Sequence, residues 1–384
     1  MSFTLRAGLT CCILQAVLAA QTAVGTERVQ ILTRAAALIA QHDLASSESA
    51  LQALLQGTPN DPVALNLLGV IRLEQQKAEE AERLFRRALS INPQIAGPHL
   101  NLARLYSVNR PLDSIAQLKE TFRIAPGDGQ ARSLLLRIAK EASLDALHSG
   151  DKKKALAILL QAREAAPHEP ELLYEFGMVA KEAGLQKDAQ SAFEEALQIN
   201  PGYEDAIYAL ARVYLDENMA KPAEEEMRHY LLLRPDDATA EYGLGFILFA
   251  EEKLDEAKEA FEKSLTLQPD QTESVFELGR MAQQKGDSVV ARENFKKVLS
   301  RDPHHAGTLT ELGAMEYRAA DYEKAKDDLE RAIASAPSFQ KAHYFYALTL
   351  RKLGEKEESE RQFEISRSLQ KTHTVELRLA DDQQ

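Results

Sequence analysis

Apolar residues recur with helical spacing along most of the chain. In one representative stretch, residues 170–203, they fall into two groups, Leu173, Phe176, Gly177 and Ala180, and then Ala189, Phe193 and Ala196. Steps of three and four residues place side chains on one face of a helix. The segment EAGLQKDA between the two groups is polar and contains a glycine, which is typical of a turn. The stretch is therefore predicted to form two helices joined by a short turn.

This pattern repeats, and four kinds of position keep phase with one another. Prolines close each stretch, and from Pro167 onward every step is 34 residues: Pro59, Pro93, Pro126, Pro167, Pro201, Pro235, Pro269, Pro303 and Pro337. A small residue stands in the first helix of most stretches, at Gly69, Ala103, Gly177, Ala211, Gly245, Gly279, Gly313 and Ala347. An alanine follows 12 residues later at Ala81, Ala189, Ala223, Ala257, Ala291 and Ala325. Four residues further on is a large apolar residue, at Phe85, Phe193, Met227, Phe261, Phe295, Leu329 and Phe363.

Each of these positions has a physical role. A small residue on the first helix facing an alanine on the second lets the two helix axes approach closely. The large apolar residue is expected to fill the gap toward the next unit. The proline cannot continue the second helix and sets the turn into the following unit. The units begin near Arg28, Pro62, Ala96, Leu136, Pro170, Glu204, Ala238, Thr272, Ala306 and Gln340, which gives about ten.

The pattern resembles the tetratricopeptide repeat family, whose signature is an aromatic or apolar residue, Leu-Gly, a Tyr, and then Ala, Phe and Pro at these offsets. Residues 170–203, 62–95 and 238–271 match it closely. The resemblance implies an all-α fold, a right-handed α-solenoid of about ten helix-turn-helix repeats. It also implies a protein-interaction module, without identifying the partner.

Several units depart from the signature. The chain has no Trp, and the first aromatic position is polar at His99, Glu241 and His343. The third unit is one residue short. The first unit, with Ser47 in place of the alanine, and the last, with Ser359 and Ser366, are interpreted as capping units with a polar outer face.

An insertion precedes the fourth unit. Residues 127–150 are predicted to form a longer first helix that breaks the regular stacking. The array then divides into an N-terminal segment, residues 26–126, with about three repeats, and a C-terminal segment, residues 136–373, with about seven including the cap. Residues 374–384 form a tail. A stiff continuous solenoid is the alternative.

The N-terminal 25 residues differ from the rest. They hold one basic residue, an apolar run, both cysteines of the chain (Cys11 and Cys12) and small residues at Ala19, Ala20, Ala23 and Gly25. This layout is typical of a secretory signal peptide, with cleavage after Ala19 or Gly25 and export to a bacterial periplasm. The alternative is a cytosolic protein with an N-terminal helix. No later segment has the uninterrupted apolar run that a membrane span requires.

Composition and motifs argue against catalysis and against nucleic-acid binding. The formal net charge is −13, with 59 acidic and 46 basic residues, whereas binding to a phosphate backbone depends on clustered basic residues. No HExxH, P-loop, GxGxxG, GxSxG or EF-hand sequence occurs. The sequence therefore assigns no catalytic residue, no cofactor and no metal ligand, and predicts a protein that is not an enzyme.

The family resemblance implies that the first helix of each unit lines a concave groove and that the fifth position of the unit points into it. From the fifth unit onward this position is aromatic except at Thr310; it holds Tyr174, Tyr208, Tyr242, Phe276 and Tyr344. The ninth position adds Arg212, Phe246 and Arg280, and the twelfth adds Phe249 and Tyr317. Aromatic rings and arginines are the residues that carry most binding energy at interfaces. These ten residues are a candidate peptide groove, although the rings are also explained by packing against neighbouring first helices.

Three functions remain open from the sequence. The first is a scaffold or adaptor that binds a peptide segment or a partner helix, with a role in envelope complex assembly. The second is a substrate-recognition subunit of an enzyme, for example of glycosyltransferase type, supplied by another chain. The third is a cytosolic regulator. The identity of the partner and the oligomeric state are not determined by the sequence.

Overall fold

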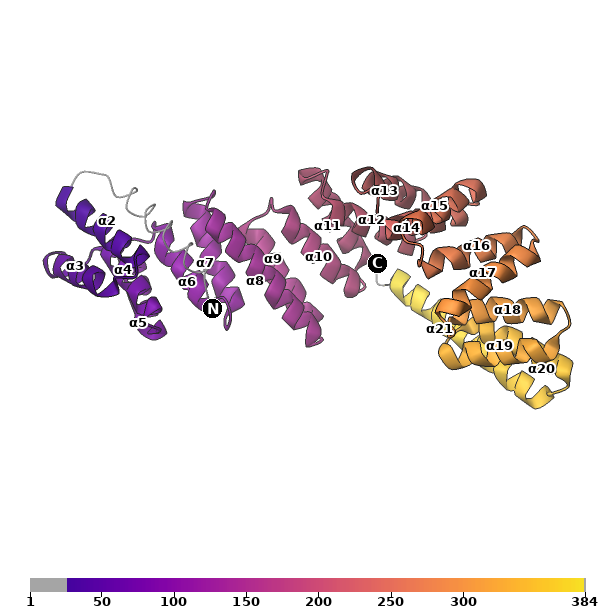
Figure 1. Ribbon diagram of the computed structural model, residues 1–384. Coiled ribbons are helices and arrows are strands. Elements are labelled where there is room, and N and C mark those ends of the chain that lie inside the picture. The colour runs from indigo at the N-terminus through magenta and orange to yellow at the C-terminus, as the bar shows by residue number, and fades with distance from the viewer. Residues whose placement is uncertain (1–25, 383–384) are drawn as a thin grey trace. The chain divides into compact units, whose positions relative to one another are not determined.

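The computed structural model describes residues 26–382, and the predicted leader, residues 1–25, lies outside them. Within this range the chain forms twenty helices and no strand, arranged as ten successive pairs (Figure 1). The two helices of a pair pack against each other, and the first helices of neighbouring pairs also touch, as α14 touches α16 and α18 touches α20. The fold is therefore the all-α solenoid of helix-turn-helix repeats that the sequence predicts.

The described residues divide into two compact units, one ending at Pro201 and one beginning at Gly202. The helices of the first unit are α2 (Thr26–Ala40), α3 (Leu44–Gly57), α4 (Pro62–Glu74), α5 (Ala78–Ile91), α6 (Ala96–Tyr106), α7 (Pro111–Ile124), α8 (Gly129–His148), α9 (Lys152–Ala165), α10 (Pro170–Glu182) and α11 (Gln186–Ile199). The insertion at residues 127–150 corresponds to α8, which has 20 residues.

The helices of the second unit are α12 (Glu204–Asp216), α13 (Ala220–Leu233), α14 (Ala238–Ala250), α15 (Leu254–Leu267), α16 (Thr272–Gln284), α17 (Ser288–Arg301), α18 (Ala306–Arg318), α19 (Tyr322–Ser335), α20 (Gln340–Leu353) and α21 (Lys356–Asp382). The last of these includes most of the segment that the sequence separates as a tail. None of the helices described in either unit is both long enough and apolar enough to cross a membrane.

The glycine of the first helix is in contact with the large residue of its own second helix. A Cβ added at Gly177 would lie 2.5 Å from the Phe193 ring, and one added at Gly245 would lie 2.7 Å from the Phe261 ring. Such distances are too short for real atoms, so only glycine permits this approach. The expectation that the large residue serves mainly to fill the gap toward the next unit is therefore incomplete, because its ring first sets the spacing within the pair.

The alanine position of the second helix lies against the backbone of the first helix. Serine occupies this position three times, and each hydroxyl donates to a backbone carbonyl of the small residue on the first helix. The bonds run from Ser47 to Ala35 (2.9 Å), from Ser114 to Ala103 (2.6 Å) and from Ser359 to Ala347 (2.8 Å). All three serines are buried, and so is Ser366. Ser47, Ser359 and Ser366 therefore face inward with their hydrogen bonds satisfied, and the polar outer face expected of the two capping units is not formed by them.

The turn inside a pair uses a left-handed backbone conformation at one fixed position. The residues with positive φ are His42, Gln76, Gly150, Gly184, Asn218, Glu252, Gly286, Ala320 and Gly354. The described part of the third pair has no such residue, because α6 ends early and the Arg110 N–H donates to the Tyr106 carbonyl at 2.8 Å. The residue missing from the third unit is thus missing from its turn.

The polar residues at the family's first aromatic position are buried and bonded. The Nδ1 atoms of His99 and His343 lie 2.8 and 2.6 Å from the side-chain oxygens of Gln117 and Gln362, on the second helix of the same pair. Glu241 forms an ion pair with Lys263 at 2.5 Å. Each replaces an aromatic contact by a satisfied polar contact, so the departures from the signature preserve the fold.

We predict that the contact between Gly177 and Phe193 limits which side chains this pair of helices accepts. Gly177→Ala should lower the free energy of unfolding by about 1–3 kcal/mol, since the added methyl overlaps the ring. Adding Phe193→Met should recover part of the loss, because Ala211 and Met227 occupy the equivalent positions of a later pair. Thermal unfolding of the full chain, followed by circular dichroism, measures both effects.

Gly57→Ala is the control, because a Cβ there meets nothing within 4 Å. If Gly177→Ala proves as stable as Gly57→Ala, the glycine does not set the helix spacing.

Candidate functional site

The aromatic residues at the fifth position pack on rings of their own second helix. The ring centroids are 5.9 Å apart for Tyr174 and Phe193, 5.1 Å for Tyr208 and Tyr230, 6.0 Å for Tyr242 and Phe261, 5.9 Å for Phe276 and Phe295, and 6.0 Å for Tyr344 and Phe363. Four of the five are half-buried, and Tyr344 is 43% exposed. Each ring therefore packs against the second helix with one of its sides. That the remaining exposed surface binds a partner stays a prediction.

One group of predicted residues comes together between α14 and α16. The Arg280 guanidinium carbon lies 5.4 Å from the centroid of the Phe249 ring and 6.0 Å from that of Phe276. A guanidinium over an aromatic face is attracted by the ring quadrupole. The ring of Phe246 lies 6.4 Å from that of Tyr242 on the same helix. Residues of two successive first helices, α14 and α16, thus form one mixed aromatic and cationic surface.

The other predicted residues belong to other helices. Tyr174 belongs to α10 in the first unit, and Arg212 is exposed on α12. The ring of Tyr317 lies 5.8 Å from Tyr322 and 6.3 Å from Phe345. Thr310, which interrupts the aromatic series, is buried and its hydroxyl donates to the Ala306 carbonyl at 2.8 Å.

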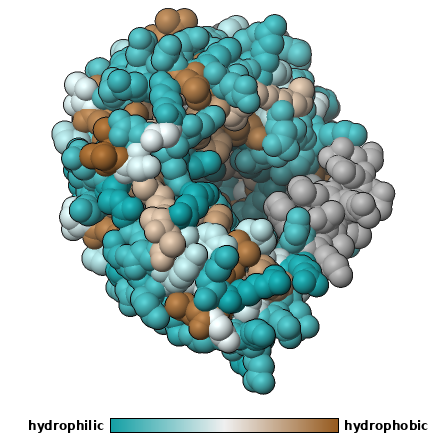
Figure 2. Space-filling view, turned by 90° about the vertical axis from the view of Figure 1, so that its right-hand side faces the viewer, coloured by the Kyte–Doolittle hydropathy of each residue, from teal (hydrophilic) through white to brown (hydrophobic). Residues whose placement is uncertain are grey.

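An open cavity of about 700 Å³ lies beside Arg280 and Phe249. Its lining comes from five helices, α14, α16, α17, α18 and α20, and includes Phe249, Arg280, Gln283, Gln284, Ser288, Arg292, Glu311, Met315, Arg318, Ala319 and Lys341. All of these belong to the second unit. Figure 2 shows a surface with a hollow that is lined mostly by hydrophilic residues.

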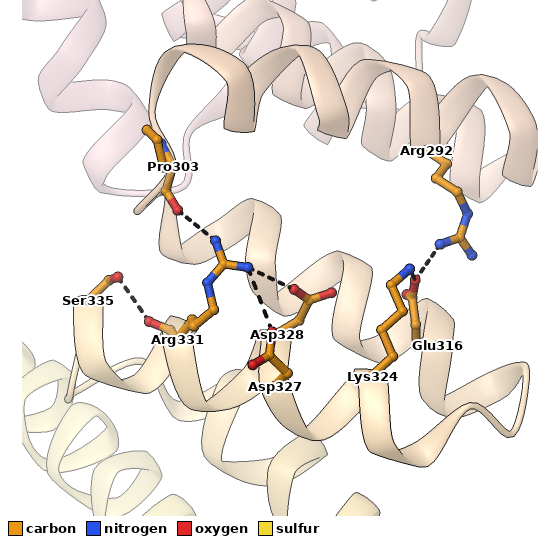
Figure 3. A network of polar contacts seen from close by, with 8 residues as sticks. All are labelled: Arg292, Pro303, Glu316, Lys324, Asp327, Asp328, Arg331 and Ser335. Carbon is orange, nitrogen blue, oxygen red and sulfur yellow. Dashed lines mark hydrogen bonds and ion pairs between the residues drawn. The ribbon is translucent and has the colours of Figure 1, made fainter.

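The cavity is rich in cations although the chain as a whole is acidic. Arg280 is bonded to Glu277 at 2.9 Å, Lys341 is bonded to Glu311, and Arg292 is bonded to Glu316. Figure 3 shows the last of these pairs: Glu316 lies between Arg292 and Lys324, which contacts it at 2.6 Å. The three carboxylates are buried. Buried carboxylates need such partners, because an unpaired buried charge is costly.

The second contact network in Figure 3 links neighbouring pairs of helices. Arg331 on α19 donates to the Pro303 carbonyl at 3.2 Å, in the turn that ends the preceding unit, and contacts Asp328 at 3.2 Å. Arg87 and Arg301 make the equivalent bond to Pro59 and Pro269, each at 2.8 Å. These arginines are engaged in holding the turn between units, and they do not line the cavity.

Arg318 also lines the cavity, but its partners differ from those of Arg280, Arg292 and Lys341. With the Gln283 amide oriented to satisfy both of its groups, its oxygen accepts from Arg318 Nη1 at 3.0 Å and its nitrogen donates to Glu311 Oε2 at 3.2 Å. The Arg318 guanidinium carbon lies 5.5 Å from the Phe345 ring centroid. Within the described part of the chain, Arg318 thus contacts a neutral amide and an aromatic ring.

The sequence singled out two of the lining residues, Phe249 and Arg280. It missed Gln283, Glu311, Arg318 and Lys341 because only aromatic residues and their arginine neighbours were followed along the fifth, ninth and twelfth positions. Gln283 occupies the same twelfth position as Phe249 and Tyr317, and Arg318 follows directly after it in its own unit. A search for polar residues at these two positions would have found both. Between residues 26 and 382 no cluster of His, Cys, Asp or Glu is placed to hold a metal ion.

Comparison with known proteins gives a consistent picture. Family models described as tetratricopeptide repeat match residues 32–95, 180–244, 239–271 and 310–365, which together cover more than half of the chain. No curated protein matches the chain.

Solved structures match as well. MamA from Desulfovibrio magneticus is 27% identical, with a TM-score of 0.42, and the match covers 44% of this chain and 97% of that one. YrrB, described as a TPR protein with an unusual peptide-binding site, is 22% identical over 59% of this chain and 95% of its own, with a TM-score of 0.40. A tetratricopeptide repeat protein from Parabacteroides merdae is 16% identical over 66% of this chain and 98% of its own, with a TM-score of 0.46.

We predict a pH dependence that originates at Glu277, behind Arg280. Burial raises the pKa of Glu277 above its ordinary value; Glu273 and Glu311 act in the same direction, and Arg280 opposes them. A carboxyl whose folded pKa is raised binds more protons in the folded state, so its contribution to stability falls as the pH rises above the unfolded pKa, roughly 4. Wild type should therefore lose stability relative to Glu277→Gln as the pH rises from roughly 4 toward neutral.

Melting temperatures of both proteins across this range measure the effect. Glu225→Gln, at an exposed position of α13, controls for the loss of one charge. A wild-type to Glu277→Gln difference that stays constant with pH would show that Glu277 does not titrate differently in the folded state.

Proposed function

Because this chain belongs to the tetratricopeptide repeat family, we propose that it is a non-enzymatic scaffold or adaptor that binds an extended peptide segment, or a partner helix, along its first helices. The cavity beside Arg280 carries this proposal. It is open, it is formed by side chains from five helices of one unit, and it combines a half-buried ring, Phe249, with charged groups. A peptide supplies both apolar side chains and hydrogen-bonding groups, so it suits such a mixed surface.

The physical chemistry of the lining supports binding over packing alone. Aromatic rings and arginines provide much contact area for little loss of conformational freedom, and they dominate measured interface energies. Phe249 contacts Arg280, whose guanidinium carbon lies 5.4 Å from the ring centroid, and the ring is only half-buried. Tyr344 remains 43% exposed although it contacts Phe345 and Phe363. Both rings therefore retain surface that a partner can cover.

We predict that Phe249→Ala and Tyr344→Ala each weaken peptide binding about tenfold, since each removes an aromatic contact from the interface. Alanine at Tyr174, Tyr208 or Tyr242 is less informative, because these rings pack on the second helix and their loss should lower stability as well. The measurement is selection of peptides from a random library by the full chain, followed by fluorescence anisotropy with the selected peptides.

Leu232→Ala is the matched control, because Leu232 is an apolar residue 81% exposed at the end of α13, outside the cavity. Wild type that selects no peptide, or Phe249→Ala and Tyr344→Ala variants that bind as Leu232→Ala does, would count against the proposed site. Melting temperatures near that of wild type show that the variants remain folded.

We further propose that residues 1–25 direct export to a periplasm and are then removed, which would place the scaffold where envelope complexes assemble. The support is the arrangement of one basic residue, an apolar run and small residues described for the sequence. The expected result is a mature protein in the periplasmic fraction whose first residue follows Ala19 or Gly25. N-terminal sequencing after cell fractionation tests this, and a cytosolic protein that retains Met1 contradicts it.

A further inference from the structure

The cations that line the cavity of the second unit differ in their partners. Four cations line it, and three of them, Arg280, Arg292 and Lys341, are each bonded to a buried carboxylate of this chain. The fourth cation, Arg318, is bonded to the neutral amide of Gln283. Among the residues that the structure describes, Arg318 is therefore the one lining cation that contacts no carboxylate.

The guanidinium of Arg318 is held in place by neutral groups of the described part of the chain. It lies over the Phe345 ring, which comes from the next pair of helices, and Gln283 on α16 accepts one of its hydrogen bonds. An arginine has five N–H donors in a rigid plane, so one bond to an amide leaves most of them available. Arg318 is also exposed, so an anion can reach it from solvent.

Apolar surface lies in the same cavity. Phe249 is half-buried on α14, and Met315, one turn before Arg318 on α18, is 7% exposed. A ligand that pairs with Arg318 thus has an apolar neighbour to contact across the cavity. A small inorganic anion would leave this surface uncovered, whereas a peptide with adjacent acidic and apolar side chains would use both parts.

We propose that Arg318 binds the carboxylate of an Asp or Glu side chain in a peptide, whose neighbouring apolar side chain covers Phe249. The inference rests on the proposed peptide-binding function and names the chemistry of the peptide. A carboxylate fits the planar donor pairs of a guanidinium with two parallel hydrogen bonds. Glu311 does not compete for this role, because its oxygens are already bonded to Lys341 and to Gln283.

The test compares Arg318→Gln with Arg351→Gln in the full chain. Both arginines lie in the last turn of a first helix and are exposed, but Arg351 does not line the cavity. Peptides are selected from a random library with each protein. The most enriched sequence is synthesised with an acetylated N-terminus and an amidated C-terminus, so that its only carboxylates are side chains. A second peptide replaces its Asp or Glu by Asn or Gln.

We expect wild type and Arg351→Gln to enrich peptides with an acidic residue next to an apolar one. Arg318→Gln should bind the acidic peptide about tenfold more weakly, and the amide version of the peptide should bind wild type equally weakly. Combining the two changes should cause little further loss, because both remove the same interaction. Arg318→Lys, which keeps the charge without the planar donor pair, should be intermediate.

Three outcomes would overturn the inference. Peptides selected without an acidic residue, or bound equally by Arg318→Gln, would leave the proposed function intact and remove the role of Arg318. Binding that requires a free C-terminal carboxylate or a phosphorylated residue would assign the cavity to a different anion. Selection of no peptide by any of the proteins would instead refute the proposed function itself, and this inference with it.

Discussion

The contact between a glycine of the first helix and a large residue of the second fixes the geometry on which the rest of the molecule depends. A Cβ at Gly69, Gly177, Gly245 or Gly279 would lie 2.5–2.7 Å from a phenylalanine ring. Pairs with alanine in the first helix mostly use a smaller partner, as Ala35 with Leu51 and Ala211 with Met227 do. In these pairs a larger residue on one helix thus accompanies a smaller residue on the other, which keeps the two helices of a pair closely packed.

A fixed spacing has a consequence for function, because it brings equivalent positions of successive first helices to neighbouring places. The rings of Tyr242 and Phe276 each use one side to pack on the phenylalanine that contacts the glycine. The same residues therefore support the pair and present their other side outward. Packing and binding are therefore compatible roles for these aromatic residues. One side of each ring packs inside the pair, and the other side is left for a partner to contact.

In the second unit, buried glutamates determine where the cations of the cavity lie. Glu277, Glu311 and Glu316 are buried on first helices, and each holds a cation at the edge of the cavity. The cations that make the cavity basic are thus mostly employed in stabilising buried carboxylates, which limits how much they attract an anion. Arg318 is different because its guanidinium is positioned by an amide and a ring, and neither of these removes its charge.

The sequence by itself determined the repeat, because prolines, small residues and large apolar residues spaced by 34 positions act locally: each ends a helix, permits an approach or fills a space within one unit. The family resemblance, extended by one and two helical turns, also identified Phe249 and Arg280 as candidate groove residues. Only the tertiary structure decided that Phe193 closes onto Gly177 and that Ser47 points inward. It also brought Phe249, Arg318 and Lys341 to one cavity. These three are separated by several tens of residues, and their meeting depends on how far each pair is displaced from the last, which no local pattern encodes.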